Sequence, residues 1–138
     1  MNNYFIILAA GKGSRFGSKV PKQFHLYKNK PLFMHSIDTA NKSNLFKKII
    51  LVLNKPNLFK KIKNVDVIKG GKERYLSSKR ALNFIKNKKV NNVFIHDAAR
   101  PNFSIKLLEK LNNESKSNDC VIPGLQVTDS VKLKTFRK

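Results

Sequence analysis

Three glycines and a set of cations follow the first apolar run of the chain, residues 4–9. Residues 10–17 read AGKGSRFG, so most positions are small and the backbone N–H groups can turn toward a ligand without a bulky side chain in the way. Arg15, Lys19 and Lys22 add fixed positive charge around the same loop. The combination predicts a loop that binds phosphate and suits a polyanionic triphosphate.

The glycine spacing separates this loop from two common nucleotide-binding motifs. It is not a P-loop, because no Gly-Lys-Ser/Thr closes it, and it misses the dinucleotide fingerprint because the third glycine is Gly17 where position 16 is required. From spacing alone, a plain turn between a strand and a helix explains Gly11 and Gly13 as well as a phosphate site does.

A single carboxylate, Asp97, lies at the exit of a later apolar run and is followed by Ala98 and Ala99. Such a carboxylate could hold Mg²⁺ while the small neighbours leave room for triphosphate oxygens. The alternative is that Asp97 caps the following turn or pairs with Arg100. His96 would point to the opposite side of the strand, so we expect it to be structural.

Short apolar runs alternate with helical patterns, which is typical of a parallel sheet covered by helices. Strands are expected at 4–9, 48–53, 65–69, 92–96, 120–127 and 130–134. Helices are expected at 31–42, at 74–86 and after an N-cap at Ser104, with at most one helical turn in 54–59. The core-facing helix residues are predicted to be Leu32, His35, Ile37 and Ala40, then Leu76, Ala81, Leu82 and Ile85, then Ile105, Leu107, Leu108 and Leu111.

Ligands of open parallel sheets bind beyond the carboxyl ends of the strands. Residues 9–17, 70–74 and 96–101 each follow one of the first four strands, so three unusual segments are expected to share one rim. This shared position predicts a single site.

Composition limits the function classes. The 138 residues suffice for one domain, and 29 basic against 8 acidic residues give a formal charge of +21, which favours anionic partners. Lysine and asparagine are spread along the whole chain, which indicates compositional drift more than a dedicated nucleic-acid surface.

Cys120 is the only cysteine, so an internal disulfide is excluded and a reducing, cytoplasmic location is expected. His25 and His35 lack metal-ligand spacing. No apolar run approaches the length of a membrane span and no signal peptide precedes residue 4, so we expect no membrane partner.

Four motifs together carry a resemblance to a known family. AAGKGSRFG with PKQF resembles the signature of nucleotidyltransferases that join a nucleoside triphosphate to a sugar phosphate. HDAARP at 96–101 and GGKERYLSS at 70–78 are most similar to the 2-C-methyl-D-erythritol 4-phosphate cytidylyltransferases of isoprenoid synthesis. Lys72 stands where that family often has an acidic residue, and Ser78 replaces a small apolar one.

The resemblance implies a Rossmann-like α/β fold with three α/β/α layers, and transfer of CMP from CTP to the sugar-alcohol phosphate with release of pyrophosphate. The roles it implies are catalysis by Arg15 and Lys22, substrate binding by Ala9, Ala10, Gly11, Gly13, Gly71, Ser77, Ala98 and Ser130, and Mg²⁺ binding by Asp97. Gly71 and Ser77 would read the cytosine, and Ser130 takes the place of a threonine that contacts the sugar phosphate.

The resemblance also implies a single domain over 1–138 that lacks the C-terminal part of the family, whose full-length members are expected to be homodimers. Three alternatives remain open. They are a ribitol-5-phosphate cytidylyltransferase, a catalytically incomplete CTP-binding remnant, and a basic module that binds nucleic acid.

Overall fold

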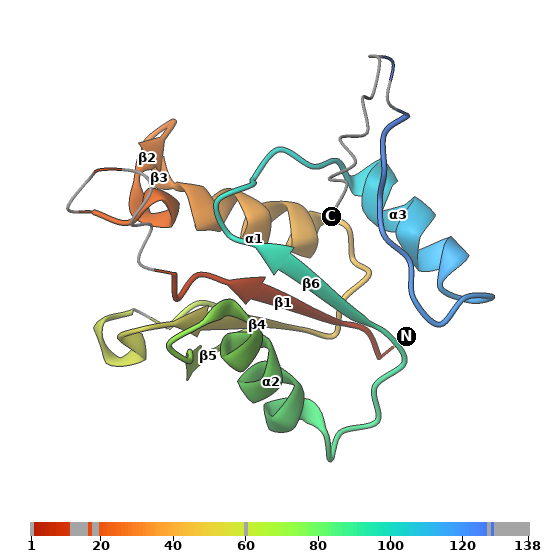
Figure 1. Ribbon diagram of the computed structural model, residues 1–138, viewed down its shortest axis with the longest axis horizontal. Helices are drawn as coiled ribbons and strands as arrows, with labels where there is room; N and C mark the ends of the chain where they lie inside the picture. The colour runs from red at the N-terminus through yellow and green to blue at the C-terminus, as the bar shows by residue number, and fades with distance from the viewer. Residues whose placement is uncertain (1, 12–16, 18–19, 60, 127, 129–138) are drawn as a thin grey trace, which may run out of the picture.

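The computed structural model describes residues 2–11, 17, 20–59, 61–126 and 128. Within these residues, strands and helices alternate along the chain (Figure 1). The elements are β1 (Tyr4–Leu8), η2 (Lys22–Phe24), β2 (Leu26–Tyr27), β3 (Lys30–Pro31), α1 (Leu32–Lys42), β4 (Lys48–Leu53), η3 (Pro56–Leu58), β5 (Val65–Lys69), α2 (Arg74–Ile85), β6 (Val93–Asp97) and α3 (Ile105–Glu114).

The central sheet has four parallel strands in the order β5-β4-β1-β6. β1 therefore lies inside the sheet, with β4 and β5 on one side of it and β6 on the other. Leu8 pairs with Val52 of β4 and with Asp97 of β6, so the carboxyl ends of these three strands are level. The direction of strand addition reverses between β1 and β6, which makes that point the expected ligand crevice.

Helices cover both faces of this sheet, with α1 and α3 on one face and α2 on the other (Figure 1). Phe5 and Ile7 of β1 pack toward α1 and α3, while Tyr4 and Ile6 pack toward α2. A strand buried on both faces needs apolar side chains at every position, which explains the unbroken sequence YFIIL. The predicted three-layer α/β/α architecture is confirmed.

The buried face of α1 differs from the prediction. Phe33 and Ser36 are fully buried together with the expected Ile37 and Ala40, whereas Leu32 and His35 are only partly buried. The aromatic ring of Phe33 packs edge-on against Phe24 and Phe59, and this packing sets the rotation of the helix.

The other two helices also bury a polar residue on the sheet side. In α2, Ser77 is buried while Leu82 is 42% exposed, because the packing surface follows Ser77, Ala81 and Ile85. In α3, Leu108 and Asn112 are buried and the other expected leucines are partly so. Ser104 caps α3 as predicted by accepting a hydrogen bond from the N–H of Leu107 at 3.1 Å.

A two-stranded hairpin, β2 with β3, was not expected from the sequence. Its turn residues Lys28 and Asn29 have φ values of 46° and 58°, the paired left-handed conformation of a tight hairpin turn. The usual Asn-Gly or Asp-Gly signal is absent here, which explains why the hairpin was missed.

The expected strand at 120–127 is wrong for residues 120–126, to which the structure assigns no strand. Pro123 lacks a backbone N–H for a ladder, and Ile122 and Leu125 are 81% and 96% exposed, so no packing favours pairing here. The expected strand at 130–134 lies outside the described residues. Among the described residues, no helix has the length and apolar character needed to cross a membrane.

His96 is enclosed on the α1 and α3 side of the sheet, as expected for a structural histidine. Its ring centroid lies 4.6 Å from that of Phe103 and 5.6 Å from that of Phe5, and its Nε2 is 3.2 Å from Ser36 Oγ. Burial lowers the pKa of His96 below its ordinary value of 6.5, although the negative charge of Asp97 opposes this effect.

This pKa shift predicts a loss of stability in mild acid. A histidine whose folded-state pKa is lowered binds a proton more readily in the unfolded chain, so its stabilising contribution is present above pH 6.5 and is lost as the pH falls through the folded-state pKa. We expect the urea midpoint to fall between pH 7.5 and pH 5.5, and His96→Gln to flatten that fall. Equal slopes for His96→Gln and the wild type would contradict the prediction.

Candidate active site

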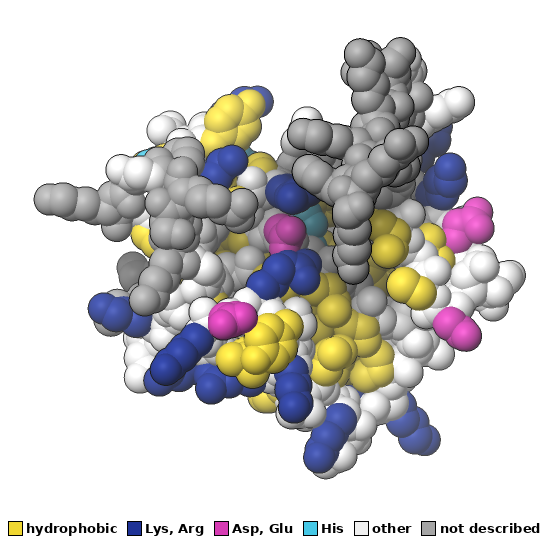
Figure 2. Space-filling model, viewed as in Figure 1, with side chains coloured by type: hydrophobic (Ala, Val, Ile, Leu, Met, Phe, Trp, Pro, Cys, Tyr) yellow, Lys and Arg dark blue, Asp and Glu magenta, His cyan; other side chains and the backbone are white. Residues whose placement is uncertain are grey.

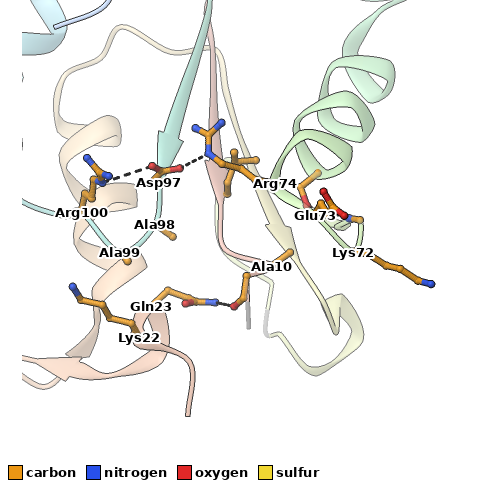
Figure 3. Close-up of a pocket in the computed structure, with 14 residues that line it drawn as sticks. Ala10, Lys22, Gln23, Lys72, Glu73, Arg74, Asp97, Ala98, Ala99 and Arg100 are labelled. Atoms are coloured by element: carbon orange, nitrogen blue, oxygen red, sulfur yellow. Dashed lines mark hydrogen bonds and ion pairs between the residues drawn. The ribbon is translucent and has the colours of Figure 1, made fainter. Parts of the chain in front are cut away.

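A cleft of about 610 Å³ opens beyond the carboxyl ends of β1 and β6 (Figure 3). Four segments line it, namely the loop after β1, the η2 turn, the loop leading into α2, and the turn after β6. The cleft therefore lies at the point where strand order reverses, and the three segments that the sequence placed on one rim do meet there.

Gln23 fixes the start of the glycine loop. The residue is 5% exposed, and its side-chain amide nitrogen donates to the carbonyl oxygens of Ala9 at 2.8 Å and Gly11 at 2.7 Å. Because a trans peptide holds C=O and N–H on opposite sides, the pinned Ala9 carbonyl directs the N–H of Ala10 away from Gln23. The amide thus sets the orientation of the backbone from Ala9 to Gly11, where the glycine loop begins.

The same turn places Lys22 on the cleft. Pro21 precedes η2, and the N–H of Phe24 bonds to the Pro21 carbonyl at 2.9 Å, so the turn that carries Lys22 is defined by backbone geometry. Lys22 and Gln23 are consecutive, which couples the position of the cation to the position of the glycine loop. Gly13, Arg15 and Lys19 lie outside the described residues.

Close packing in the loop before α2 requires its two glycines. A Cβ on Gly70 would collide with Ala10 Cβ and would lie 3.0 Å from Ser77 Oγ, and a Cβ on Gly71 would collide with Leu76. Gly71 N–H donates to the buried Ser77 hydroxyl at 3.1 Å. Since that hydroxyl accepts from Gly71, its own proton is directed elsewhere and remains available to an acceptor.

Asp97 ends β6 and faces the cleft with two arginines around it (Figure 3). Its Oδ1 is 2.9 Å from Arg74 Nε and its Oδ2 is 3.6 Å from Arg100 Nε. The pairing with Arg100 that the sequence left as an alternative is therefore present, and Arg74 adds a second partner.

The residues around the cleft are predominantly basic. Lys22, Lys72, Arg74 and Arg100 line it against Glu73 and Asp97. Across the visible face of the molecule, lysine and arginine side chains are dispersed with few acidic ones between them (Figure 2). The cleft therefore combines a local excess of positive charge with backbone donors, which suits a phosphorylated ligand.

The donor set of the cleft fits a magnesium ion shared with phosphates. The described residues contain no group of three or more His, Cys, Asp or Glu side chains arranged to hold a metal. Asp97 is a single carboxylate whose side chain is 37% exposed at the cleft. Mg²⁺ is commonly held by one or two carboxylates plus substrate phosphates and water, so this arrangement is sufficient for it.

The structure brings most of the predicted site residues together and separates one. Ala10, Gly11, Lys22, Gly71, Ser77, Asp97 and Ala98 all line the cleft. Ala9 does not line the cleft, because its side chain packs in the core on the α1 and α3 side of the sheet. Ser130 lies outside the described residues.

Sequence reasoning overlooked Gln23 and Arg74. The signal for Gln23 was its position directly after Lys22, and that for Arg74 was its place at the start of a helix beside the glycine pair. Neither residue type reveals its partner without the fold.

The strand order, the start of the glycine loop and the carboxylate at the end of β6 define the class of protein as an α/β fold of the nucleotidyltransferase type. The family model of IspD, 2-C-methyl-D-erythritol 4-phosphate cytidylyltransferase, matches residues 4–136. The chain therefore belongs to the 2-C-methyl-D-erythritol 4-phosphate cytidylyltransferase family.

Individual relatives agree with this assignment. The chain is 56% identical over 138 residues to the bifunctional enzyme IspD/IspF of Pelagibacter ubique, with 97% of this chain and 37% of that protein covered. It is 36% identical to the 2-C-methyl-D-erythritol 4-phosphate cytidylyltransferase of Caldicellulosiruptor bescii, with 96% and 62% covered. The structure of the bifunctional IspDF from Campylobacter jejuni matches with a TM-score of 0.84 at 34% identity, over 96% of this chain and 36% of that one. The chain thus spans about a third to three fifths of the length of these relatives.

Gln23→Met should weaken both the fold and ligand binding. The substitution keeps the length of the side chain but leaves the carbonyls of Ala9 and Gly11 without their donor, which costs about 1–3 kcal/mol of unfolding free energy. We also expect weaker binding of CTP in calorimetric titration, because the loop loses its fixed orientation. Gln126→Met makes the same exchange at an exposed position and should change neither quantity. A Gln23→Met protein with wild-type stability would refute the role given to this amide.

Proposed function

We propose that this chain carries the nucleotide-binding and catalytic face of a cytidylyltransferase that transfers CMP from CTP to 2-C-methyl-D-erythritol 4-phosphate and releases pyrophosphate. The observation that carries the proposal is the convergence of the glycine loop, Lys22, the Gly71 and Ser77 pair and Asp97 on one cleft. Membership of the family supports the choice of reaction.

The reaction is an in-line attack of a sugar-phosphate oxygen on the α-phosphorus of CTP. The bond from that phosphorus to the bridging oxygen of the β-phosphate breaks, and pyrophosphate leaves with the electron pair. No covalent enzyme intermediate is required, so the work of the protein is to orient two anions and to stabilise the charge that develops between them.

The described residues divide these tasks. Lys22 provides positive charge for the phosphates, and Ala10 and Gly11 present backbone at the floor of the cleft. The Ser77 hydroxyl donates to an acceptor of the cytosine ring, held in place by the N–H of Gly71. Arg15 and Gly13, which lie outside the described residues, are proposed to complete the triphosphate contacts, and Ser130 to contact the acceptor.

Asp97 is proposed to hold Mg²⁺, which would neutralise phosphate charge when bound. The carboxylate is accessible from the cleft and sits among residues that would surround the triphosphate. We further propose homodimerisation of the full-length enzyme and a cytoplasmic location. The exposed, unpaired thiol of Cys120 suits a reducing compartment.

Lys22→Met should reduce turnover by about a hundredfold or more, because removal of one preorganised charge donor at a reacting phosphate has effects of that size. The fold should be unchanged, since Lys22 lies at the cleft and not in either core cluster. Pyrophosphate release from CTP and Mg²⁺ measures the effect, with circular dichroism as the check on folding. Lys72→Met, an exposed lysine on the opposite wall, is the comparison variant and should retain more activity. Full turnover by Lys22→Met would exclude this role.

The pyrophosphate assay, together with two binding measurements, separates the alternatives. Pyrophosphate release with ribitol 5-phosphate instead of methylerythritol phosphate would indicate the related cytidylyltransferase. Calorimetric CTP binding without pyrophosphate release with either acceptor would indicate a binding remnant. Tight nucleic-acid binding with a steep salt dependence and no CTP preference would indicate the basic module.

A further inference from the structure

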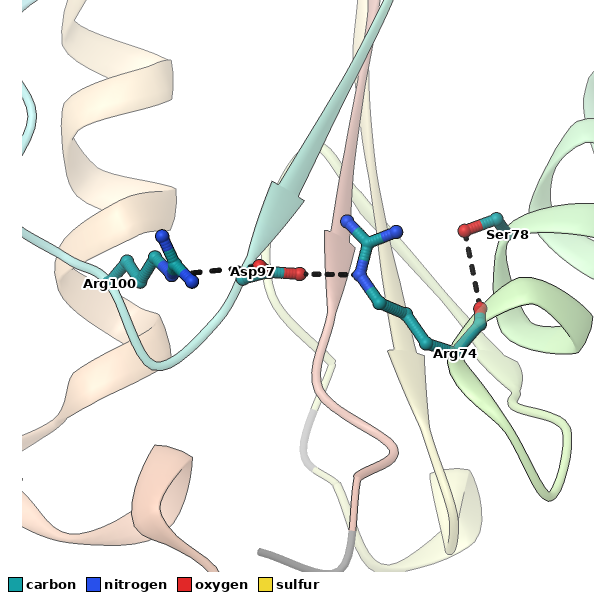
Figure 4. Close-up of polar contacts among 4 residues, drawn as sticks. All are labelled: Arg74, Ser78, Asp97 and Arg100. Atoms are coloured by element: carbon teal, nitrogen blue, oxygen red, sulfur yellow. Dashed lines mark hydrogen bonds and ion pairs between the residues drawn. The ribbon is translucent and has the colours of Figure 1, made fainter. Parts of the chain in front are cut away.

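The carboxylate proposed to hold magnesium is already engaged on both of its oxygens (Figure 4). Arg74, the first residue of α2, contacts Oδ1 of Asp97 at 2.9 Å, and Arg100 from the following turn contacts Oδ2 at 3.6 Å. Two positive charges thus face one negative charge, so the immediate surroundings of Asp97 are net positive.

That arrangement opposes a free divalent cation. Mg²⁺ binds carboxylate oxygens at about 2.0–2.1 Å, so an ion on Oδ1 would crowd the guanidinium of Arg74, which contacts the same oxygen at 2.9 Å. A hydrated cation must also approach two arginines of the same sign. Cation binding to Asp97, above all at Oδ1, is therefore favoured when Arg74 moves away.

Moving the Arg74 side chain away from Asp97 costs little free energy. Its side chain is 63% exposed, and ion pairs with that degree of exposure contribute little to stability. The backbone need not change, because the Arg74 carbonyl is held by the Ser78 hydroxyl at 3.3 Å within the first turn of α2 (Figure 4). Only the side chain has to rotate.

We propose that Arg74 shields Asp97 from free divalent cations and releases it when the cation arrives with a nucleotide. This inference rests on the proposed function. The phosphates of the nucleotide supply the negative charge that the guanidinium loses when it leaves Asp97, and Arg74 lines the same cleft as Lys22, Gly71 and Ser77. Nucleotide and cation should consequently bind with positive coupling, which by linkage is the same in either order.

Manganese is a suitable probe, because free Mn²⁺ is measured directly by electron paramagnetic resonance in the presence of the protein. Without nucleotide, Arg74→Gln should bind Mn²⁺ about three- to fivefold more tightly than the wild type, the range expected for loss of an exposed ion pair. Adding Asp97→Asn to Arg74→Gln should remove this gain, which locates the ion. With CTP present, the difference between Arg74→Gln and the wild type should shrink or reverse.

Lys79→Gln is the matched control, since it removes one positive charge from an exposed position of the same helix. Its Mn²⁺ affinity should change less than that of Arg74→Gln. Equal affinities for Arg74→Gln and the wild type, or an equal gain in Lys79→Gln, would overturn the shielding. A gain that CTP leaves unaltered would overturn the release. Neither readout uses turnover, so a chain that releases no pyrophosphate counts against the proposed function and not against this inference.

Discussion

The pairing of β6 with β1 is the contact on which the rest of the site depends. The ladder runs from Tyr4 opposite Val93 to Leu8 opposite Asp97, and the N–H of Ala98 extends it by donating to the Leu8 carbonyl at 3.1 Å. These bonds join segments that are nearly ninety residues apart along the chain. Because β1 continues into Ala9, Ala10 and Gly11 and β6 ends at Asp97, the hydrogen bonds of the ladder fix where the start of the glycine loop lies relative to the carboxylate.

Polar side chains convert this backbone frame into a defined cleft. Gln23 ties the turn that carries Lys22 to the loop after β1, and Ser77 ties Gly71 to the first turns of α2. Both side chains are buried, so their bonds do not compete with bulk water and are costly to break. Among the residues that the structure describes, the exposed side chains of Arg74 and Arg100 pair with Asp97, and they are suited to exchange partners. The cleft thus has a floor held by buried hydrogen bonds and exposed charges at its entrance.

Much of this fold follows from the sequence, because apolar runs such as KIILVL and YFIIL suit only strands covered on both faces. The bounds of β4 and β5 match the expected ones, and the order of motifs at strand ends correctly brought the three cleft segments together. Helix faces were less predictable, since Ser36 and Ser77 are buried by contacts that depend on neighbouring elements.

The remaining differences have the same origin. In the hairpin of β2 and β3, Lys28 and Asn29 adopt a left-handed backbone conformation that this pair of residue types does not indicate in a sequence. Residues 120–126 have strand-like composition, but the sequence does not show whether a partner lies beside them. The sequence shows that Arg74 and Arg100 exist, but it does not show that Arg74 contacts Asp97. That contact depends on where α2 begins in the fold.

The adjacent residues His96 and Asp97 also favour the correct register of β6 against β1. Within the described part of the chain β6 pairs with β1 alone, and a shift of one residue in this pairing would turn each side chain of β6 to the other face of the sheet. A slip of one residue that places Asp97 opposite Ile7 would bring its carboxylate between Phe5 and Phe103, where the imidazole of His96 now lies. Burying that charge among aromatic rings costs several kcal/mol. The residue proposed to bind the metal therefore also penalises this misregistered pairing of β6 with β1.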